Sequence, residues 1–327
     1  MNQLLLILLL GLSTSGQNAQ LINTPIAKHG PLEVKGGRIV NQHNQPPQLR
    51  GISFSWSIWN GQKYYTPETV DWLVDDFSVS LVRLSMAIEP TGGYLEQPEI
   101  QTERITRLAD RAIERGIYVI IDWHDHNAER NKAQAEAFFS LMAKRYAAVP
   151  NVIYEIWNEP EQQPWSVIKT YAEAVISAIR SHDPHNLIVV GTPRWAQDVD
   201  IAAAEPISGF TNIAYAFHFY ASDPHHQERL RNKADKAIKM GLPLLVTEWG
   251  VGEANGDGVF DTGKTAKWLQ WMEDRQLSWA NWNLTDKAET TGLLLPGASP
   301  LGNWPVSQLS PAGQYIRTEL KKSAIRQ

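Results

Sequence analysis

The sequence contains no cysteine in its 327 residues. Disulfide bonds and thiol nucleophiles are therefore excluded, and any metal site would need histidine and carboxylate ligands. An excess of either charge is also missing, because 30 Lys and Arg stand against 35 Asp and Glu, for a formal net charge of −5. Since no basic stripe is present that could follow a phosphate backbone, we expect no nucleic-acid partner.

Long apolar runs are scarce as well. The run at residues 4–10 is too short to span a bilayer and is followed by small residues, so we interpret residues 1–20 as a secretory signal peptide. The positively charged start usual in such signals is missing apart from the α-amine, and an uncleaved N-terminal anchor is the alternative. No later run is long enough to cross a membrane, so we expect no transmembrane segment and a secreted protein, extracellular or periplasmic.

A regular alternation of two kinds of segment fills the rest of the chain. Eight short runs rich in β-branched and aromatic residues predict strands at 49–54, 81–86, 117–122, 152–157, 187–191, 213–219, 244–248 and 277–282. Apolar spacings of three and four predict helices at 66–77, 99–115, 133–148, 167–181, 227–240 and 262–275. Repeated strand and helix imply parallel pairing, and eight such units predict an α/β fold, the (β/α)8 TIM barrel.

One domain is enough for this length. With 43% hydrophobic residues the chain can fill a single large core, so we assign residues 21–327 to one catalytic barrel domain. The segment LEVKGGRIV at 32–40 places Gly-Gly between two alternating runs, which predicts a short β-hairpin outside the barrel. Thr66-Pro67 and Ser310-Pro311 are typical of an N-cap followed by proline in the first helical turn.

Two glutamates stand where a barrel of this kind carries its reactive groups, at the C-terminal ends of strands. Glu159 closes the fourth predicted strand in IYEIWNEP, and Glu248 closes the seventh in VTEWG. Burying an ionised carboxylate costs several kcal/mol, so the buried group needs either a partner that compensates its charge or a function. Strands four and seven lie on opposite sides of the barrel mouth, so the two carboxylates are predicted to face each other as a glycosidase pair does.

Five motifs occur here in the order known from one enzyme family: YVIIDWH, VIYEIWNEP, YAFHFYA, VTEWG and SWANWNLTDK. From about residue 34 to about residue 297 the sequence resembles glycoside hydrolase family five, the cellulase family, and especially its bacterial endo-β-1,4-glucanases. The resemblance implies a retaining mechanism with Glu159 as acid/base and Glu248 as nucleophile. It implies no cofactor, no metal, and a β-glucan polysaccharide or oligosaccharide as substrate; we expect a monomer.

The same resemblance implies roles for residues around the pair. Arg83 matches an arginine that supports the nucleophile, although an ordinary salt bridge, for instance with Glu155, is the alternative. Asn158 matches the residue that binds the sugar 2-hydroxyl, or else it caps the strand end. The remaining matches are His124, His218 and Tyr220 as substrate-binding and carboxylate-orienting residues, Trp59, Trp195 and Trp282 as sugar platforms, and Lys287 as a contact to sugar hydroxyls near the cleavage point.

Some positions depart from the family or carry no predicted role. Relatives have a histidine and a tyrosine where this chain has Ser55 and Ala87, and we expect Glu89 or Trp56 to substitute for them. We interpret Glu155 as structural. His126 and the pair His225-His226 receive the same interpretation.

Several functions fit this pattern. The leading one is a secreted, endo-acting, retaining hydrolase of β-1,4-glucosidic bonds in cellulose or related β-glucans. A mannanase, xylanase or broad β-glucan hydrolase would use the same chemistry, because contacts at one hydroxyl separate these polymers. A noncatalytic sugar-binding barrel would not require the two glutamates. A metal-dependent hydrolase would rest on His124-x-His126 alone, without a matching carboxylate.

Overall fold

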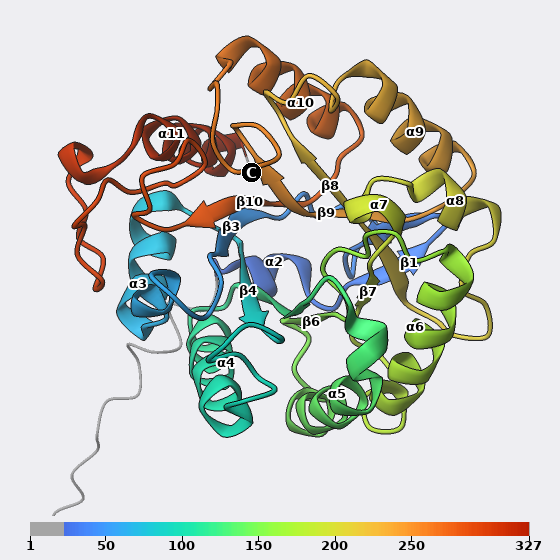
Figure 1. The fold of residues 1–327 in the computed structure, drawn as a ribbon. Helices are drawn as coiled ribbons and strands as arrows, with labels where there is room; N and C mark the ends of the chain where they lie inside the picture. Colours follow the sequence, from blue (N-terminus) through green and yellow to red (C-terminus); the bar gives the residue numbers. More distant parts are fainter. Residues whose placement is uncertain (1–22, 327) are drawn as a thin grey trace, which may run out of the picture.

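The computed structural model describes residues 23–326 and shows a closed barrel of eight parallel strands ringed by helices (Figure 1). The strand order around the barrel is β10-β3-β4-β5-β6-β7-β8-β9. The strands are β3 (Arg50–Phe54), β4 (Leu81–Ala87), β5 (Tyr118–His124), β6 (Val152–Glu155), β7 (Ile188–Val190), β8 (Ile213–Tyr220), β9 (Leu244–Gly250) and β10 (Trp279–Leu284). Each overlaps one predicted strand, and the predicted (β/α)8 barrel is confirmed.

The helices follow the predicted periodicity closely. Those at predicted positions are α3 (Pro67–Trp72), which continues as a π-helical turn (Leu73–Phe77), α4 (Pro98–Glu114), α5 (Lys132–Tyr146), α6 (Trp165–Arg180), α9 (Glu228–Lys239) and α10 (Thr262–Asp274). The Thr66 hydroxyl accepts from Thr69 N at 3.2 Å, and the Ser310 hydroxyl accepts from Gly313 N at 3.0 Å where α11 (Pro311–Arg326) begins. Both predicted N-caps are therefore present.

Three short helices have no counterpart in the prediction. They are α2 (Pro25–His29), α7 (Pro193–Ala196) and α8 (Val199–Ala204), and the last two form the crossover from β7 to β8. Single turns of 3-10 helix occur at Gly61–Tyr64, Ala128–Asn131 and Val306–Gln308. Helices of four to six residues are too short to show a helical period in the sequence.

The predicted hairpin is also confirmed, as β1 (Glu33–Lys35) paired antiparallel with β2 (Arg38–Val40). Gly36 and Gly37 form its turn with φ of 57° and 75°, a left-handed conformation that glycine adopts without strain. Val34 N donates to Asn212 Oδ1 at 2.8 Å, just before β8 begins. The hairpin therefore covers the N-terminal end of the barrel, away from the strand ends that carry the site.

The barrel interior changes character along its axis. Near the N-terminal ends it is apolar, with inward side chains such as Leu81, Ile120 and Ile153 in one buried cluster. Two positions later on the same strands the inward residues are Arg83, Asp122 and Glu155, all fully buried. The outward alternate residues pack against the helices in a second cluster. This alternation places charged groups together at the C-terminal end of the barrel.

Within residues 23–326, none of the helices has the length and apolar character needed to cross a bilayer. The predicted signal peptide, residues 1–20, lies outside the described residues.

Candidate active site

A cleft of about 460 Å³ opens at the C-terminal ends of the strands. Residues with a predicted role that line it are Trp59, His124, Asn158, Glu159, Tyr220, Glu248, Trp282 and Lys287. Arg83 and His218 lie directly beneath, fully or almost fully buried. Trp195 is the one predicted site residue that neither lines this cleft nor contacts the network under it. Instead Trp195, 36% exposed in α7, donates its backbone N–H to Pro160 O at 2.8 Å.

Glu159 reaches the cleft from a loop. The predicted strand at 152–157 is two residues too long, because β6 ends at Glu155. Ile156 and Trp157 are buried, so the loop carries the same apolar pattern as a strand. Glu159 N donates to Asp125 O at 3.3 Å, which fixes this loop against the residues that follow β5.

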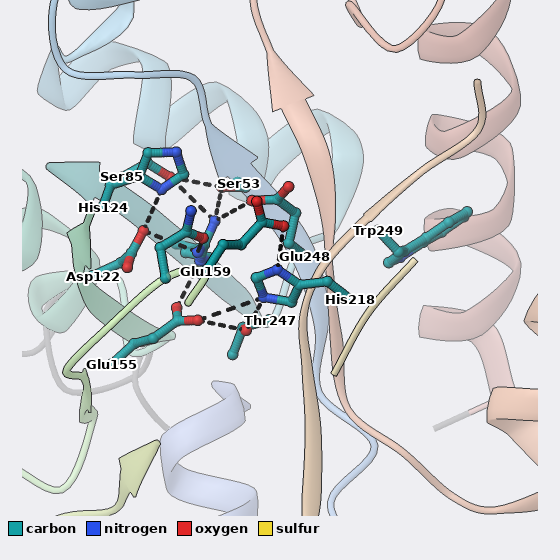
Figure 2. A network of polar contacts seen from close by, with 12 residues as sticks. Ser53, Ser85, Asp122, His124, Glu155, Glu159, His218, Thr247, Glu248 and Trp249 are labelled. Atoms are coloured by element: carbon teal, nitrogen blue, oxygen red, sulfur yellow. Dashed lines mark hydrogen bonds and ion pairs between the residues drawn. The ribbon is translucent and has the colours of Figure 1, made fainter. Parts of the chain in front are cut away.

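Glu248 reaches the cleft because β9 contains one extra residue. Between the pairs Ala216↔Leu245 and His218↔Glu248, β8 advances by two residues and β9 by three. The pairing of β9 with β10 shows the same extra residue. Thr247 and Glu248, consecutive in sequence, therefore both point into the barrel, whereas Figure 2 shows Trp249 pointing away. A bulge of this kind re-aims a side chain beside an active site.

The two glutamates face each other closely (Figure 2). One ligand atom from each of Glu159, Glu248 and His218 can be chosen so that all three lie within 4.8 Å of one another. Glu248 accepts from Arg83 Nη1 at 2.9 Å and from the Tyr220 hydroxyl at 2.8 Å, one donor on each oxygen. Burial, followed by the charge of Glu159, raises the pKa of Glu248, and the Arg83 and Tyr220 contacts oppose that rise.

Arg83 is the centre of the buried network. Its guanidinium contacts Glu248, Glu155 Oε2 at 2.7 Å, Asp122 Oδ2 at 2.9 Å and Asn158 Oδ1 at 2.6 Å. Both interpretations of Arg83 therefore hold in the geometry, because it contacts the proposed nucleophile and also forms a salt bridge with Glu155. Burial alone would lower the pKa of Arg83, but the carboxylates raise it, so the guanidinium stays charged.

His218 links the second glutamate to the interior. Its Nδ1 lies 2.9 Å from Glu159 Oε1, and its Nε2 lies 2.8 Å from Thr247 Oγ1. Burial alone would lower the pKa of His218, but Glu155, Glu159 and then Glu248 raise it to about 9. Burial alone would raise the pKa of Glu159, but its hydrogen bond with His218 lowers that pKa overall. Glu159 and His218 thus form a tightly coupled pair with a proton between them.

Aromatic rings form one wall of the cleft. His124 stacks on Trp282 with ring centroids 5.3 Å apart and planes at 4°, and the rings of Trp56 and His124 are perpendicular with centroids 4.3 Å apart. Trp56 also contacts Trp59, which is 60% exposed at the rim. Burial lowers the pKa of His124 well below its usual value, so this ring is neutral, and its Nδ1 bonds Asp122 Oδ2 at 2.7 Å. These rings give the cleft a mostly apolar wall suited to sugar faces.

Polar residues line the cleft as well. Lys287 is exposed and pairs with Glu289 Oε2 at 2.5 Å, and both residues line the cleft. Ser55 lines the cleft too, together with its neighbour Trp56. Of the two expected substitutes for the family histidine and tyrosine, Trp56 therefore takes part in the site. Glu89 is exposed, contacts Asn131 at 3.4 Å and does not line the cleft.

Some residues of the site were not predicted from the sequence. Asp122, which contacts Arg83 and His124, could have been found from its position two residues before His124 on the same face of β5. Thr247 carries no chemical signal of its own in the sequence. His126, interpreted as structural, lines the cleft with Nε2 3.8 Å from Glu159 Oε2.

A metal ion has one candidate position among the described residues, the group Glu159, His218 and Glu248. Both nitrogens of His218 are already engaged there, so an ion would have to displace Glu159 or Thr247 from the ring. His124 and His126 do not gather a third ligand among residues 23–326, and their Nδ1 atoms contact Asp122 and Glu161.

A (β/α)8 barrel with two opposed carboxylates at its mouth defines a class, the barrel glycoside hydrolases. The model of the cellulase family, glycosyl hydrolase family 5, matches residues 40–288, and the chain belongs to this family. It is 46% identical over 274 residues to Endoglucanase Z of Dickeya dadantii, spanning 83% of this chain and 63% of that protein. It is 42% identical over 285 residues to Endoglucanase A of Evansella cellulosilytica, spanning 85% and 57%.

Solved structures with the same fold also cover most of the chain. A protein from Cytophaga hutchinsonii matches with a TM-score of 0.90 and 44% identity over 93% of this chain and 98% of that one. The catalytic domain of the Thermobifida fusca endoglucanase Cel5A matches with a TM-score of 0.86 and 35% identity, over 91% and 100%. The chain spans less than two thirds of the length of the two curated relatives above. The resemblance predicted from the motifs is confirmed.

Proposed function

We propose that this protein is a secreted endo-β-1,4-glucanase that cleaves internal bonds of cellulose or related β-glucans by a retaining double displacement. The observation that carries the proposal is the pair of carboxylates, Glu159 and Glu248, with oxygens within 4.8 Å across the cleft. Retaining enzymes hold their carboxyl groups roughly 5–5.5 Å apart, whereas inverting enzymes need roughly 6.5–9.5 Å to admit a water. This spacing supports the retaining route.

In the first step the proton shared by His218 and Glu159 passes through the Glu159 carboxyl to the glycosidic oxygen as the bond from that oxygen to the anomeric carbon breaks. A carboxylate oxygen of Glu248 forms a bond to the anomeric carbon from the opposite face, giving a covalent glycosyl-enzyme. In the second step the Glu159 carboxylate takes a proton from water, the water oxygen attacks the anomeric carbon, and Glu248 leaves. Each glutamate ends as it began.

The surrounding residues prepare this chemistry. Arg83 and Tyr220 each donate to one oxygen of Glu248, which orients the nucleophile and opposes the pKa rise caused by burial. Arg83 also holds the amide oxygen of Asn158, so the amide nitrogen of Asn158 is left for the sugar 2-hydroxyl. A contact of this kind accelerates the reaction to the extent that it strengthens in the transition state.

The substrate class is supported by the cleft wall and by the relatives. Trp56, Trp59 and Trp282 present rings along a cleft that is open at the rim, which suits the middle of a chain of β-linked glucose. The relatives above are named endoglucanases, and a variant of the Thermobifida fusca enzyme has been solved with cellotetraose. Because such polymers lie outside the cell, we also propose secretion, and we expect a monomer without a cofactor.

Hydrolysis of carboxymethylcellulose, lichenan, mannan and xylan measured in parallel tests the proposal. We expect activity on the first two, with solution viscosity falling faster than reducing ends appear. Glu159→Gln and Glu248→Gln serve as matched controls that keep the side-chain size. Activity confined to mannan or xylan would move the protein to the alternative substrate class, and no activity on any of the four would contradict the proposal.

A further inference from the structure

One buried carboxylate has no part in the steps above. Glu155, the last residue of β6, is completely buried, and each of its oxygens has a different donor. Oε2 accepts from Arg83 Nε at 2.7 Å. Oε1 accepts from the Thr247 hydroxyl at 2.6 Å, a contact visible in Figure 2. Burial alone would raise the pKa of Glu155, but Arg83 and then His218 lower it overall, so the carboxylate is ionised.

The hydrogen bonds that start at Glu155 run in one direction only. An ionised carboxylate has no proton to donate, so the Thr247 hydroxyl must give its hydrogen to Glu155. The Thr247 oxygen is then the acceptor in its 2.8 Å contact with His218, and Nε2 of that ring must carry a proton. Glu155 thereby fixes which nitrogen of His218 is always protonated.

The consequence reaches Glu159. With Nε2 protonated, the 2.9 Å contact between His218 Nδ1 and Glu159 Oε1 is a hydrogen bond only if one more proton lies between these two atoms. That proton sits either on Nδ1, beside an ionised Glu159, or on Glu159, beside a neutral ring. In both arrangements it is available to the glycosidic oxygen through Glu159.

We propose that Glu155 is a positioning residue which, through Thr247, sets the tautomer of His218 and so keeps a proton at the acid/base Glu159. The proposal rests on the hydrolytic function proposed above. Through its other oxygen Glu155 also holds the arginine that orients the nucleophile, so this one buried carboxylate connects to both catalytic glutamates.

The charges around His218 favour the same arrangement. Negative groups face it from three segments: Glu155 from β6, with Oε1 3.7 Å from Nε2, Glu159 from the following loop, and Glu248 from β9. Positive Arg83 on β4 and the neutral His124 on β5 lie across the site, together with Asp122, whose pKa burial raises well above its usual value. The raised pKa of His218, about 9, agrees with a ring that retains its proton through neutral pH.

Glu155→Gln reverses the direction of the hydrogen bonds. Arg83 Nε–H needs an acceptor, so the amide oxygen of the variant faces Arg83 and its NH2 group faces Thr247. The Thr247 hydroxyl then donates to His218 Nε2, and the ring carries its proton on Nδ1. Glu159 then accepts a hydrogen bond from Nδ1–H and stays an ionised carboxylate, and the neutral ring has no second proton to pass to it.

The test compares aryl β-cellobiosides whose leaving groups need or do not need a proton. For Glu155→Gln we expect kcat/KM to fall about 100-fold or more with phenol as leaving group and by less than about 5-fold with 2,4-dinitrophenol, because general acid catalysis contributes roughly 10²–10⁴. The basic limb of the pH profile should move to lower pH, since a negative charge beside His218 is lost. Thr247→Ser keeps the hydroxyl and should retain the wild-type ratio of kcat/KM between the two leaving groups, whatever its overall rate.

An equal loss with both leaving groups, or no loss with either, overturns the proposal. A second measurement does not depend on how the variant folds: the ring nitrogen resonances of His218 in the ¹⁵N-histidine-labelled wild type. We expect Nε2 to stay protonated as the ring is titrated above pH 9, and a neutral ring protonated on Nδ1 would contradict the inference. A wild type that cleaves no cellobioside and no glucan would instead contradict the proposed function.

Discussion

Replacing Arg83 by methionine removes a guanidinium that contacts three buried carboxyl groups. Arg83 Nε lies 2.7 Å from Glu155, and its two terminal nitrogens lie 2.9 Å from Glu248 and Asp122. Both Arg83 and Glu155 are completely buried, so water cannot replace the lost partner. Methionine replaces the aliphatic stem of the arginine without its guanidinium, so the effect reports the loss of the charge together with its hydrogen bonds.

The expected cost follows from this burial. Removing one partner of a buried ion pair destabilises a protein by about 3–5 kcal/mol. For a domain of this size each kcal/mol shifts Tm by about 2–4 °C, so Arg83→Met should melt about 10 °C below the wild type near neutral pH. Arg83→Lys keeps the charge but cannot contact all the partners, so its Tm should lie between those of Arg83→Met and the wild type.

The cost should also depend on pH, with a definite sign. In the folded wild type the pKa of Glu155 is lowered. Its contribution to stability is therefore present at pH values above the pKa of the unfolded chain, and it is lost as the pH falls through the pKa of the folded state. Without the guanidinium the pKa values of Glu155 and Glu248 rise, and the folded variant gains protons that the unfolded chain does not. The gap in Tm between variant and wild type should therefore narrow from pH 8 to pH 5.

Thermal unfolding followed by circular dichroism at pH 5, 6.5 and 8 measures this gap. Equal melting temperatures for Arg83→Met and the wild type would show that the ion pairs do not hold the site together. A gap that widens toward pH 5 would refute the assignment of the charges.

Three further results are expected. His218 has a pKa of about 9 in the folded state against 6.5 in the unfolded chain, so its protonation contributes about 3 kcal/mol to stability. This contribution is complete below pH 6.5 and is lost as the pH rises through 9. His218→Asn should therefore lose less stability than the wild type between pH 7 and 10, and parallel losses of stability would contradict this. Trp59→Ala should raise KM for long oligosaccharides several-fold, because it loses a stacking contact worth about 1 kcal/mol. Trp195→Ala should raise this KM less, and a larger effect of Trp195→Ala than of Trp59→Ala would place the substrate along α7. EDTA should leave the rate on lichenan unchanged, whereas a loss restored by zinc would mean that Glu159, His218 and Glu248 hold an ion.

The barrel and the location of its site could be predicted because they depend on local patterns. Short apolar runs separated by helical periods predict parallel strands, and the C-terminal strand ends then locate Glu159 and Glu248. The inward alternation along β4 likewise puts Arg83 in the interior. These features follow from the sequence of each segment taken alone.

Other features depend on how neighbouring strands pair. The extra residue in β9, which turns both Thr247 and Glu248 inward, changes the register with β8 and β10 and leaves no trace in the hydrophobic period. Glu155 could be interpreted only as structural, because its role depends on hydrogen bonds to residues 72 and 92 positions away. Trp195 is exposed in a four-residue helix whose position no sequence pattern predicts.

Trapping the covalent intermediate tests the central claim most directly. The wild type would be incubated with 2,4-dinitrophenyl 2-deoxy-2-fluoro-β-cellobioside, digested, and the labelled peptide sequenced by mass spectrometry. In a double displacement with Glu248 as nucleophile, the fluorosugar is found on Glu248 in a one-to-one adduct that forms as dinitrophenol is released. An adduct on Glu159 would exchange the two roles, and release of dinitrophenol at the same rate from Glu248→Gln would contradict the account.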